Sequence, residues 1–210
     1  MRLPPFTPRS GVTRVVLLRH AEPDIASGRV YGRLDIPLSQ AGLATAARSA
    51  EALLPHPFSA IYASPLTRAR QTAEIVAGSR TQAFQTIPGL EEIDLGQVEG
   101  LTRDEIVLRF PELYHSWMER PYEVMFPSGE SFACVRQRVL PLIKSLRAAH
   151  DGEAILLVAH AGVNRVTLAD ALGMPSSCLF RLDQSYCAVN IIDYFGDAPV
   201  VKLMNGCARG

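Results

Sequence analysis

Two apolar runs that both end in histidine place the tightest limit on how this chain can fold. The run "VVLLRH" ends at His20 and the run "ILLVAH" ends at His160, and neither alternates apolar with polar residues. A strand without such alternation is covered on both faces, as in a parallel sheet packed between two layers of helices. The sequence therefore predicts buried strands over 13–18 and 153–160.

Helical and strand-like patterns alternate along the rest of the chain. The predicted helices cover 38–54, 65–78, 131–150 and 161–173, with shorter helical pieces at 102–110 and 111–119. The other predicted strands cover 59–64, 83–88, 187–195 and 199–205. Ser39 is the expected N-cap of the first helix, while Pro65 and Gly78 are the expected first turn and end of the second. This order predicts an α/β fold with a largely parallel central sheet and helices on both faces.

The length of the chain allows one sizeable hydrophobic core in its 210 residues. We expect a flexible N-terminal tail over 1–12 and a single domain over 13–210, with a cap-like insertion at about 97–130. Large apolar residues in this insertion are expected either to cover a bound ligand or to form the core of a small helical subdomain. They are Phe110, Tyr114, Trp117, Met118, Tyr122 and Phe126.

The balance of charge argues against a nucleic-acid or membrane-surface partner, because 21 basic residues offset 21 acidic ones. Any anion site must therefore be local. The four cysteines form no Cys-x-x-Cys pair, which favours free thiols in a reducing compartment. No segment approaches the roughly 20 apolar residues of a membrane span, and the first residues lack the apolar core of a signal peptide. We expect a cytoplasmic protein, and a homodimer is left open.

The two strand-ending histidines are predicted to face one crevice. The carboxyl ends of parallel strands meet at the same edge of a sheet, and ligands bind there. Arg19 precedes the first histidine, and an arginine directed into such a crevice needs an anion to neutralise it. The alternative is that His20 and His160 are ordinary buried histidines whose ring nitrogens bind backbone groups.

Further charged residues follow in the second helix and in the loop after the third strand. Arg68 is expected one turn into its helix, where free backbone N–H groups and the helix dipole favour a phosphate. Glu91 and Glu92 lie in a loop bounded by glycines. A glutamate held beside a bound phosphate has its pKa raised by the like charge and can serve as an acid, whereas most loop glutamates are simply solvated.

Six segments, in their order along the chain, resemble the motifs of the histidine phosphatase superfamily, which includes the cofactor-dependent phosphoglycerate mutases. They are "LLRHAE", "YGRLDIPLSQAG", "ASPLTRARQTAE", "LEEIDLGQVEG", "FPSGES" and "LLVAHAGVNR". The resemblance runs from about residue 13 to residue 172. Within the superfamily, "EIDLGQVEGLTRDEI" is most similar to the branch of alpha-ribazole-5'-phosphate phosphatases and broad-specificity phosphatases.

The resemblance implies a phosphoglycerate mutase-like fold and a histidine acid-type phosphatase. Such an enzyme hydrolyses a small phosphomonoester through a phosphohistidine, without metal or cofactor, and alpha-ribazole-5'-phosphate of cobalamin biosynthesis is one candidate substrate. The family pattern implies His20 as nucleophile and Glu92 as proton donor. It also implies that Arg19, Arg68 and His160 are phosphate ligands.

The chain departs from the family pattern at two positions near the first histidine, and it offers further candidates for the substrate pocket. Many members place a phosphate-binding Asn six residues after the nucleophile, where this chain has Ala26, and Arg29 and Arg33 are candidate replacements. Many also have Gly directly after that histidine, where this chain has Ala21. We also expect Ala161, Glu130 and Ser131 to line the substrate pocket. Ser131 is equally suited to cap a helix.

Three other functions compete with the phosphatase. The first is a phosphoglycerate mutase, and the second is a phosphoester-binding protein that has lost catalysis, for which Ala26 is the argument. The third is a metal-dependent hydrolase, against which the ligand spacing speaks because no His-Glu-x-x-His or Cys-x-x-Cys motif is present. Its candidate ligands are His20, Glu22, His160 and either Asp170 or Asp183.

Overall fold

A mixed α/β architecture is seen in the computed structural model, which describes residues 4–5, 9–78, 80 and 82–207. The central sheet of this described part has the strand order β3-β2-β4-β1-β5-β6. The first four strands in sequence run parallel to one another, and the last two pair antiparallel. The strands are β1 (Val12–Arg19), β2 (Ala60–Ala63), β3 (Phe84–Thr86), β4 (Ala154–Ala159), β5 (Val189–Phe195) and β6 (Ala198–Gly206).

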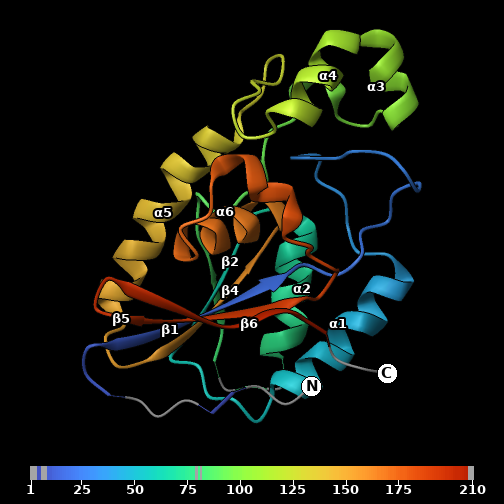
Figure 1. Ribbon diagram of the computed structural model, residues 1–210. Coiled ribbons are helices and arrows are strands. Elements are labelled where there is room, and N and C mark those ends of the chain that lie inside the picture. The colour runs from blue at the N-terminus through green and yellow to red at the C-terminus, as the bar shows by residue number, and fades with distance from the viewer. Residues whose placement is uncertain (1–3, 6–8, 79, 81, 208–210) are drawn as a thin grey trace.

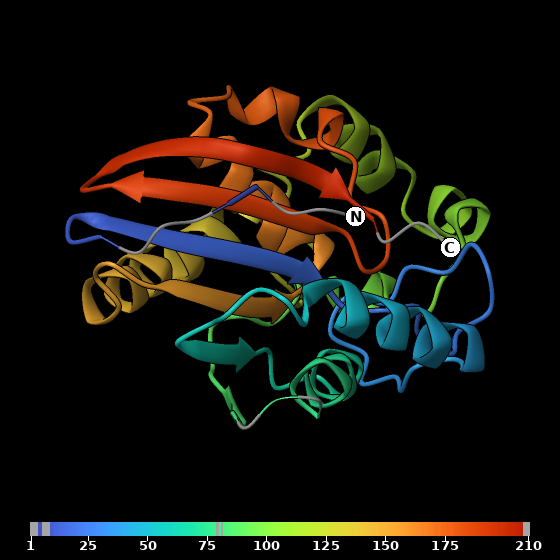
Figure 2. The same ribbon diagram turned by 90° about the horizontal axis from the view of Figure 1, so that it is seen from below.

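Helices cover both faces of the sheet, as the sequence predicts (Figures 1 and 2). Along β1 the side chains of Val15 and Leu17 face one helical layer, and those of Val16 and Leu18 face the other. Each of these four side chains is at most 1% exposed, which explains why the run shows no polar alternation. The first layer contains α5 (Phe132–Ala149) and α6 (Ala161–Ala171), and the second contains α1 (Gln40–Leu53) and α2 (Thr67–Ala77).

The pairing of β1 with β4 fixes where the two histidines lie. Their parallel register places Arg19 beside Ala159. The backbone N–H of His20 donates to the carbonyl of Ala159 at 2.9 Å, so the ladder continues one residue beyond the strand. His20 and His160 therefore follow neighbouring strands at the same edge of the sheet.

The start of α2 differs from the sequence prediction. Pro65 lies before the helix instead of in its first turn, because Leu66 is the N-cap residue. The carboxylate of Asp35 accepts hydrogen bonds from the backbone N–H and the hydroxyl of Thr67, at 2.6 and 2.9 Å. A distant side chain thus satisfies a free N–H of the first turn, and sequence spacing does not reveal it. Gly78 ends the helix as predicted.

Ser39 and Ser131 cap α1 and α5 by accepting hydrogen bonds from the backbone N–H groups of Gly42 and Cys134. The cap of α1 lies very close to the chain after His20. A Cβ atom at Gly42 would meet the carbonyl oxygen of Glu22 at 2.1 Å, so only glycine fits there. The helix start and the loop that follows β1 are therefore packed backbone against backbone.

The segment between β3 and α5 lies beyond the sheet, at the top of Figure 1. It contains η1 (Gly96–Val98), α3 (Arg103–Arg109) and α4 (Pro111–Glu119), and the two α-helices match the predicted pieces. Phe126 is 1% exposed and belongs to the main core, whereas Met118 is 53% exposed. A short helix that the sequence did not predict, η2 (Ser176–Arg181), follows α6.

The division of the chain into a tail, a domain and a cap-like insertion stays a prediction. Residues 1–3 and 6–8 of the predicted tail lie outside the described residues. The carbonyls of Pro4 and Pro5 accept hydrogen bonds from Arg14. No helix in the described part of the chain is both long enough and apolar enough to cross a membrane.

Replacement of Leu157 by Ala tests the central position of β4. Leu157 is fully buried in the helix-covered sheet, so truncation leaves a cavity and should lower the free energy of unfolding by about 2–5 kcal/mol. Leu108→Ala on α3 is the matched control, because Leu108 is 82% exposed and should change stability by no more than about 0.5 kcal/mol. Urea denaturation measures both, and equal effects would contradict the fold.

Candidate active site

His20 and His160 lie side by side at the carboxyl edge of the sheet. Their ring centroids are 5.0 Å apart, and neither residue is more than 1% exposed. The structure therefore brings together two residues that are 140 positions apart in sequence, as their place after parallel strands predicts.

The ring of His20 is held in one orientation. Its Nδ1 lies 2.7 Å from the carbonyl oxygen of Ala21, which assigns the proton to Nδ1 and the lone pair to Nε2. Nε2 accepts a hydrogen bond from Nε of Arg68 at 3.3 Å. Burial, followed by the positive charges of Arg68 and Arg19, holds the pKa of His20 well below its ordinary value. The imidazole is therefore neutral and has the form of a nucleophile.

His160 is fixed by a side chain that sequence reasoning missed. Its Nε2 lies 2.7 Å from the hydroxyl oxygen of Ser64, which follows β2 as His160 follows β4. The other ring nitrogen, Nδ1, is buried and has no partner among the described residues. Burial, followed by the positive charge of Arg68, holds the pKa of His160 well below its ordinary value. The only sequence signal for Ser64 was its place as the last residue of the strand predicted over 59–64.

Arg68 is fully buried beside both histidines without a carboxylate partner. Its two terminal nitrogens donate to the carbonyls of Gly32 and Leu34, at 2.6 and 2.7 Å, and no acidic side chain within the described residues lies within ion-pair distance. Burial is the largest effect and lowers the pKa of this arginine from its ordinary value. A buried cation held only by neutral dipoles leaves a local excess of positive charge, which suits an anionic ligand.

Arg19 contributes a second cation to the same edge of the sheet. One terminal nitrogen donates to the carbonyl of Gln184 at 2.6 Å and the other donates to the hydroxyl of Tyr31 at 3.2 Å. The guanidinium carbon lies 4.0 Å from the centroid of the Tyr186 ring, and Nε is buried without a hydrogen-bond partner among the described residues. The cation is thus oriented by three neutral groups and still has an unsatisfied donor.

Tyr31 and Tyr186 form an aromatic wall beside His20. Their ring centroids lie 6.4 and 5.8 Å from that of the imidazole, and their hydroxyl oxygens are 3.1 Å apart. Burial raises the pKa of Tyr31, so its hydroxyl stays protonated. Sequence reasoning did not identify either tyrosine, because one lies in the long loop after β1 and the other follows η2.

Glu92 lies at the start of α6, the helix that His160 caps. Its carboxylate accepts hydrogen bonds from the backbone N–H of Gly162 at 3.1 Å and from that of Ile93 at 2.9 Å. The positive end of the helix dipole stabilises negative charge at this place. A Cβ atom at position 162 would meet Oε1 of Glu92 at 2.2 Å, so the carboxylate occupies space that only a glycine leaves free.

Glu130 braces the backbone of Glu92 through two arginines. Its carboxylate binds Arg33 at 2.7 Å and Arg138 at 3.1 Å. Both arginines also donate to the carbonyl oxygen of Glu92, at 3.2 and 3.0 Å. The structure thus places Glu130 as a support for the predicted proton donor. Ser131 is the N-cap of α5, the alternative role that the sequence allowed for it.

The remaining sequence predictions have different surroundings. Ala161 is the first residue of α6, between His160 and the glycine that binds Glu92. Arg29 donates to the carbonyl of Gly100 and pairs with Glu105 at 3.2 Å. Arg29 and Arg33 are therefore both paired with carboxylates. That Arg29 or Arg33 replaces the phosphate-binding Asn of the family, where this chain has Ala26, stays a prediction.

The acidic residues proposed for a metal site are spread over the structure. Asp170 pairs with Arg136 at 2.6 Å, and the carboxylate of Asp183 accepts a hydrogen bond from the backbone N–H of Gln184. Across the described ranges, no three His, Cys, Asp or Glu side chains are grouped so that they could hold a metal ion.

Comparison with known proteins agrees with this geometry. The sequence profile of the histidine phosphatase superfamily (branch 1) matches residues 15–206. The chain belongs to this superfamily. The solved structure of YhfR from Bacillus stearothermophilus superimposes with a TM-score of 0.86 at 33% identity, covering 91% of this chain and 96% of the other. The phosphoglycerate mutase-like fold implied by the motifs is therefore confirmed.

The similar superfamily members are named as phosphatases of several esters. Phosphoserine phosphatase 1 of Hydrogenobacter thermophilus is 32% identical, with 92% of each chain covered. The adenosylcobalamin/alpha-ribazole phosphatase of Salmonella typhimurium is 31% identical over 90% of this chain and 96% of its own. A probable 2-carboxy-D-arabinitol-1-phosphatase of Arabidopsis thaliana is 33% identical over 90% of this chain, but the match spans only 40% of the plant protein.

Both site histidines should stay neutral as the solution is acidified from about pH 8 to about pH 6, since their pKa values lie well below the ordinary value of about 6.5. Because the folded-state pKa values are lowered, the stability that the neutral rings contribute is complete above about pH 6.5 and is lost as the pH falls below it. Ring chemical shifts in the NMR spectrum measure this directly. A midpoint near pH ~6.5 for either ring would contradict the described burial.

Proposed function

We propose that this protein is a metal-independent phosphomonoester hydrolase of the acid-type histidine phosphatases, and that it acts through a phosphohistidine at His20. The observation that carries the proposal is a neutral, buried imidazole whose Nε2 accepts a hydrogen bond from Arg68 and whose pKa is lowered by the charges of Arg68 and Arg19. Among the described residues, neither arginine pairs with a carboxylate. Such a group attacks a phosphate dianion without adding negative charge to it. The relatives named as phosphatases support the same reaction class.

In the first step, the bound ester displaces the hydrogen bond from Nε of Arg68 to Nε2 of His20, and Nε2 attacks phosphorus in line with the ester oxygen. The N–P bond forms while the P–O bond to the leaving alcohol breaks. Glu92, whose protonated form is favoured by the negative charge of the bound phosphate, gives its proton to the leaving oxygen. Arg19 and Arg68 hold the non-bridging oxygens through charge-assisted hydrogen bonds, each contributing roughly 1.5–3 kcal/mol before non-additivity. Positioning and electrostatics supply most of the rate enhancement in such reactions.

The second step returns the enzyme to its starting state. The carboxylate of Glu92 now accepts a proton from a water molecule, whose oxygen attacks the phosphohistidine. The N–P bond breaks, inorganic phosphate forms and Glu92 is protonated again. His160, whose Nδ1 lacks a partner among the described residues, binds a phosphoryl oxygen, and the bound dianion favours its protonation.

The proposed substrates are small phosphomonoesters, among them alpha-ribazole-5'-phosphate. The Salmonella relative, named for that activity, supports this candidate, and the relatives named for phosphoserine and 2-carboxy-D-arabinitol 1-phosphate widen the class. The four cysteines are free thiols, which supports the proposed reducing, cytoplasmic location.

Replacement of His20 by Ala should lower kcat on p-nitrophenyl phosphate at least roughly a thousandfold, because the covalent intermediate can no longer form. His115→Ala is the matched control, since the side chain of His115 is 76% exposed on α4. Rapid acid-free quenching with a radiolabelled substrate should trap an acid-labile phosphoenzyme in the wild type and in the control only.

Excess EDTA should leave the wild-type rate unchanged. A rate that falls with EDTA and returns with a divalent cation would contradict metal independence, and a labelled H20A phosphoenzyme would contradict the nucleophile. A phosphoenzyme that passes its phosphate to added phosphoglycerate faster than to water would instead indicate the mutase alternative.

Glu92→Gln should affect esters according to their leaving groups. An alkoxide needs the proton, so kcat/KM on an alkyl phosphate should fall by about 10²–10⁴-fold. The loss on p-nitrophenyl phosphate should be much smaller, because p-nitrophenolate leaves without protonation. Glu112→Gln is the control, because Glu112 is exposed on α4, away from Glu92 and its supporting arginines. Equal losses on both esters would exclude Glu92 as the proton donor.

A further inference from the structure

Arg165 on α6 provides a cation that the proposed reaction steps do not use. It lies three residues after Gly162, whose backbone N–H binds the carboxylate of Glu92. Residues three apart share a face of a helix, and helical side chains lean toward the N-terminus. Arg165 therefore extends along α6 toward the proton donor.

The electrostatic surroundings of Arg165 agree with this direction. Burial lowers its pKa, while the negative charges of Glu92 and Asp183 raise it and the positive charge of Arg19 lowers it. The charges of the proton donor and of Arg19 thus both act on the guanidinium.

The guanidinium is held in place, but the described part of the chain offers no partner to its terminal nitrogens. Nε donates to the carbonyl of Leu182 at 2.8 Å, and the guanidinium carbon lies 5.5 Å from the centroid of the Phe180 ring. Within the described residues, its two terminal nitrogens make no hydrogen bond and no carboxylate lies within 4.0 Å. In contrast, Arg138 and Arg147 are each paired with a carboxylate. An arginine fixed in this way presents a preoriented fork for a planar anion.

An aromatic cluster adjoins Arg165 on the side of the α3–α4 segment. Phe180 packs edge-on against Phe132 at 5.5 Å and against Trp117 at 6.5 Å. The Phe132 ring in turn lies 3.1 Å from the place of a Cβ atom on Gly162, beside Glu92. Arg165 is thus the cationic end of an otherwise apolar wall that reaches the proton donor.

We propose that Arg165 binds a carboxylate on the leaving alcohol, so that the enzyme favours phosphomonoesters of hydroxy acids. The proposal deepens the proposed function and depends on it. Glu92 must contact the ester oxygen in order to protonate it, so the leaving group extends from phosphorus toward Glu92 and then toward Arg165. A carboxylate one or two carbon atoms from the ester oxygen meets the free fork of the guanidinium, where a bidentate pair forms.

Two pairs of esters, each differing at the carboxylate, test this subsite. O-phosphoserine is compared with O-phosphoethanolamine, and 3-phosphoglycerate with glycerol 3-phosphate, for the wild type and for Arg165→Met and Arg165→Lys. The ratio of kcat/KM between the members of each pair should favour the carboxylate in the wild type and fall roughly 10- to 100-fold in R165M, which corresponds to a charged hydrogen bond. Lysine should restore part of the ratio, because it keeps the charge and loses the fork.

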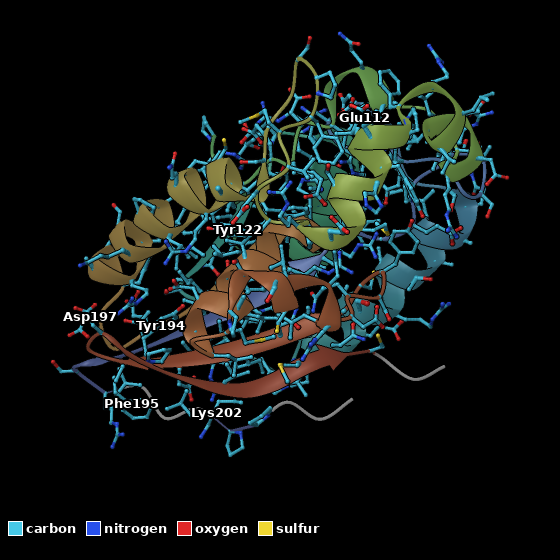
Figure 3. All side chains as sticks on the ribbon, turned by 45° about the horizontal axis from the view of Figure 1, so that its top comes forward. Glu112, Tyr122, Tyr194, Phe195, Asp197 and Lys202 are labelled. Atoms are coloured by element: carbon cyan, nitrogen blue, oxygen red, sulfur yellow. The ribbon has the colours of Figure 1, made fainter. Side chains whose placement is uncertain are left out.

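Lys202→Met is the control for the loss of one positive charge. Lys202 is exposed on β6, and Figure 3 shows it on the opposite side of the molecule from Glu112 of α4. This variant should keep the wild-type ratios. Equal losses on both members of each pair in R165M would overturn the proposal and leave Arg165 as a support of Glu92.

The failure of the proposed function has a different signature. A wild-type protein that turns over none of the four esters nor p-nitrophenyl phosphate, and that forms no phosphoenzyme, removes both proposals. A wild type that hydrolyses p-nitrophenyl phosphate through a phosphoenzyme, but does not prefer the carboxylated member of either pair, removes only the Arg165 subsite.

Discussion

The parallel backbone ladder between β1 and β4 is the interaction on which the site depends. Its register places the last residues of the two strands side by side, and the hydrogen bond from His20 to the carbonyl of Ala159 extends it to the histidine itself. β2 lies on the far side of β4 and adds Ser64 at the same level. Three adjacent strand ends thus fix the two imidazoles and the hydroxyl that orients one of them, before any loop contributes.

The site carries positive charge that the neutral groups holding Arg19 and Arg68 do not neutralise, and a bound anion would neutralise it. Arg19 and Arg68 are oriented by carbonyls and by a tyrosine hydroxyl, and their uncompensated charge helps to keep both histidines neutral. The same charge that prepares a neutral nucleophile therefore attracts the anion that the nucleophile attacks. Because the pKa values of both histidines are lowered in the folded state, however, acid weakens the folded state at this edge of the sheet.

Sequence reasoning located the groups that follow strands and helix starts, and it missed the groups that orient them. His20, His160 and Arg68 follow from hydrophobic pattern and helix geometry, because strand ends and first turns have defined positions. Tyr31 and Tyr186 lie in long connections, whose paths no local pattern specifies. Ser64 ends a predicted strand, but a serine at a strand end does not by itself indicate a contact with a histidine. The predicted start of α2 lies before the observed start because Asp35, from another segment of the chain, satisfies the N-terminus of this helix.

The bare Cα of Gly162 has a consequence for the proton donor. Any larger residue there would displace the carboxylate of Glu92 from the start of α6. In this chain, the glycine two positions after a strand-ending histidine therefore leaves the space that an acid from a distant loop fills. A side chain at position 162 would change the direction from which the leaving oxygen is protonated.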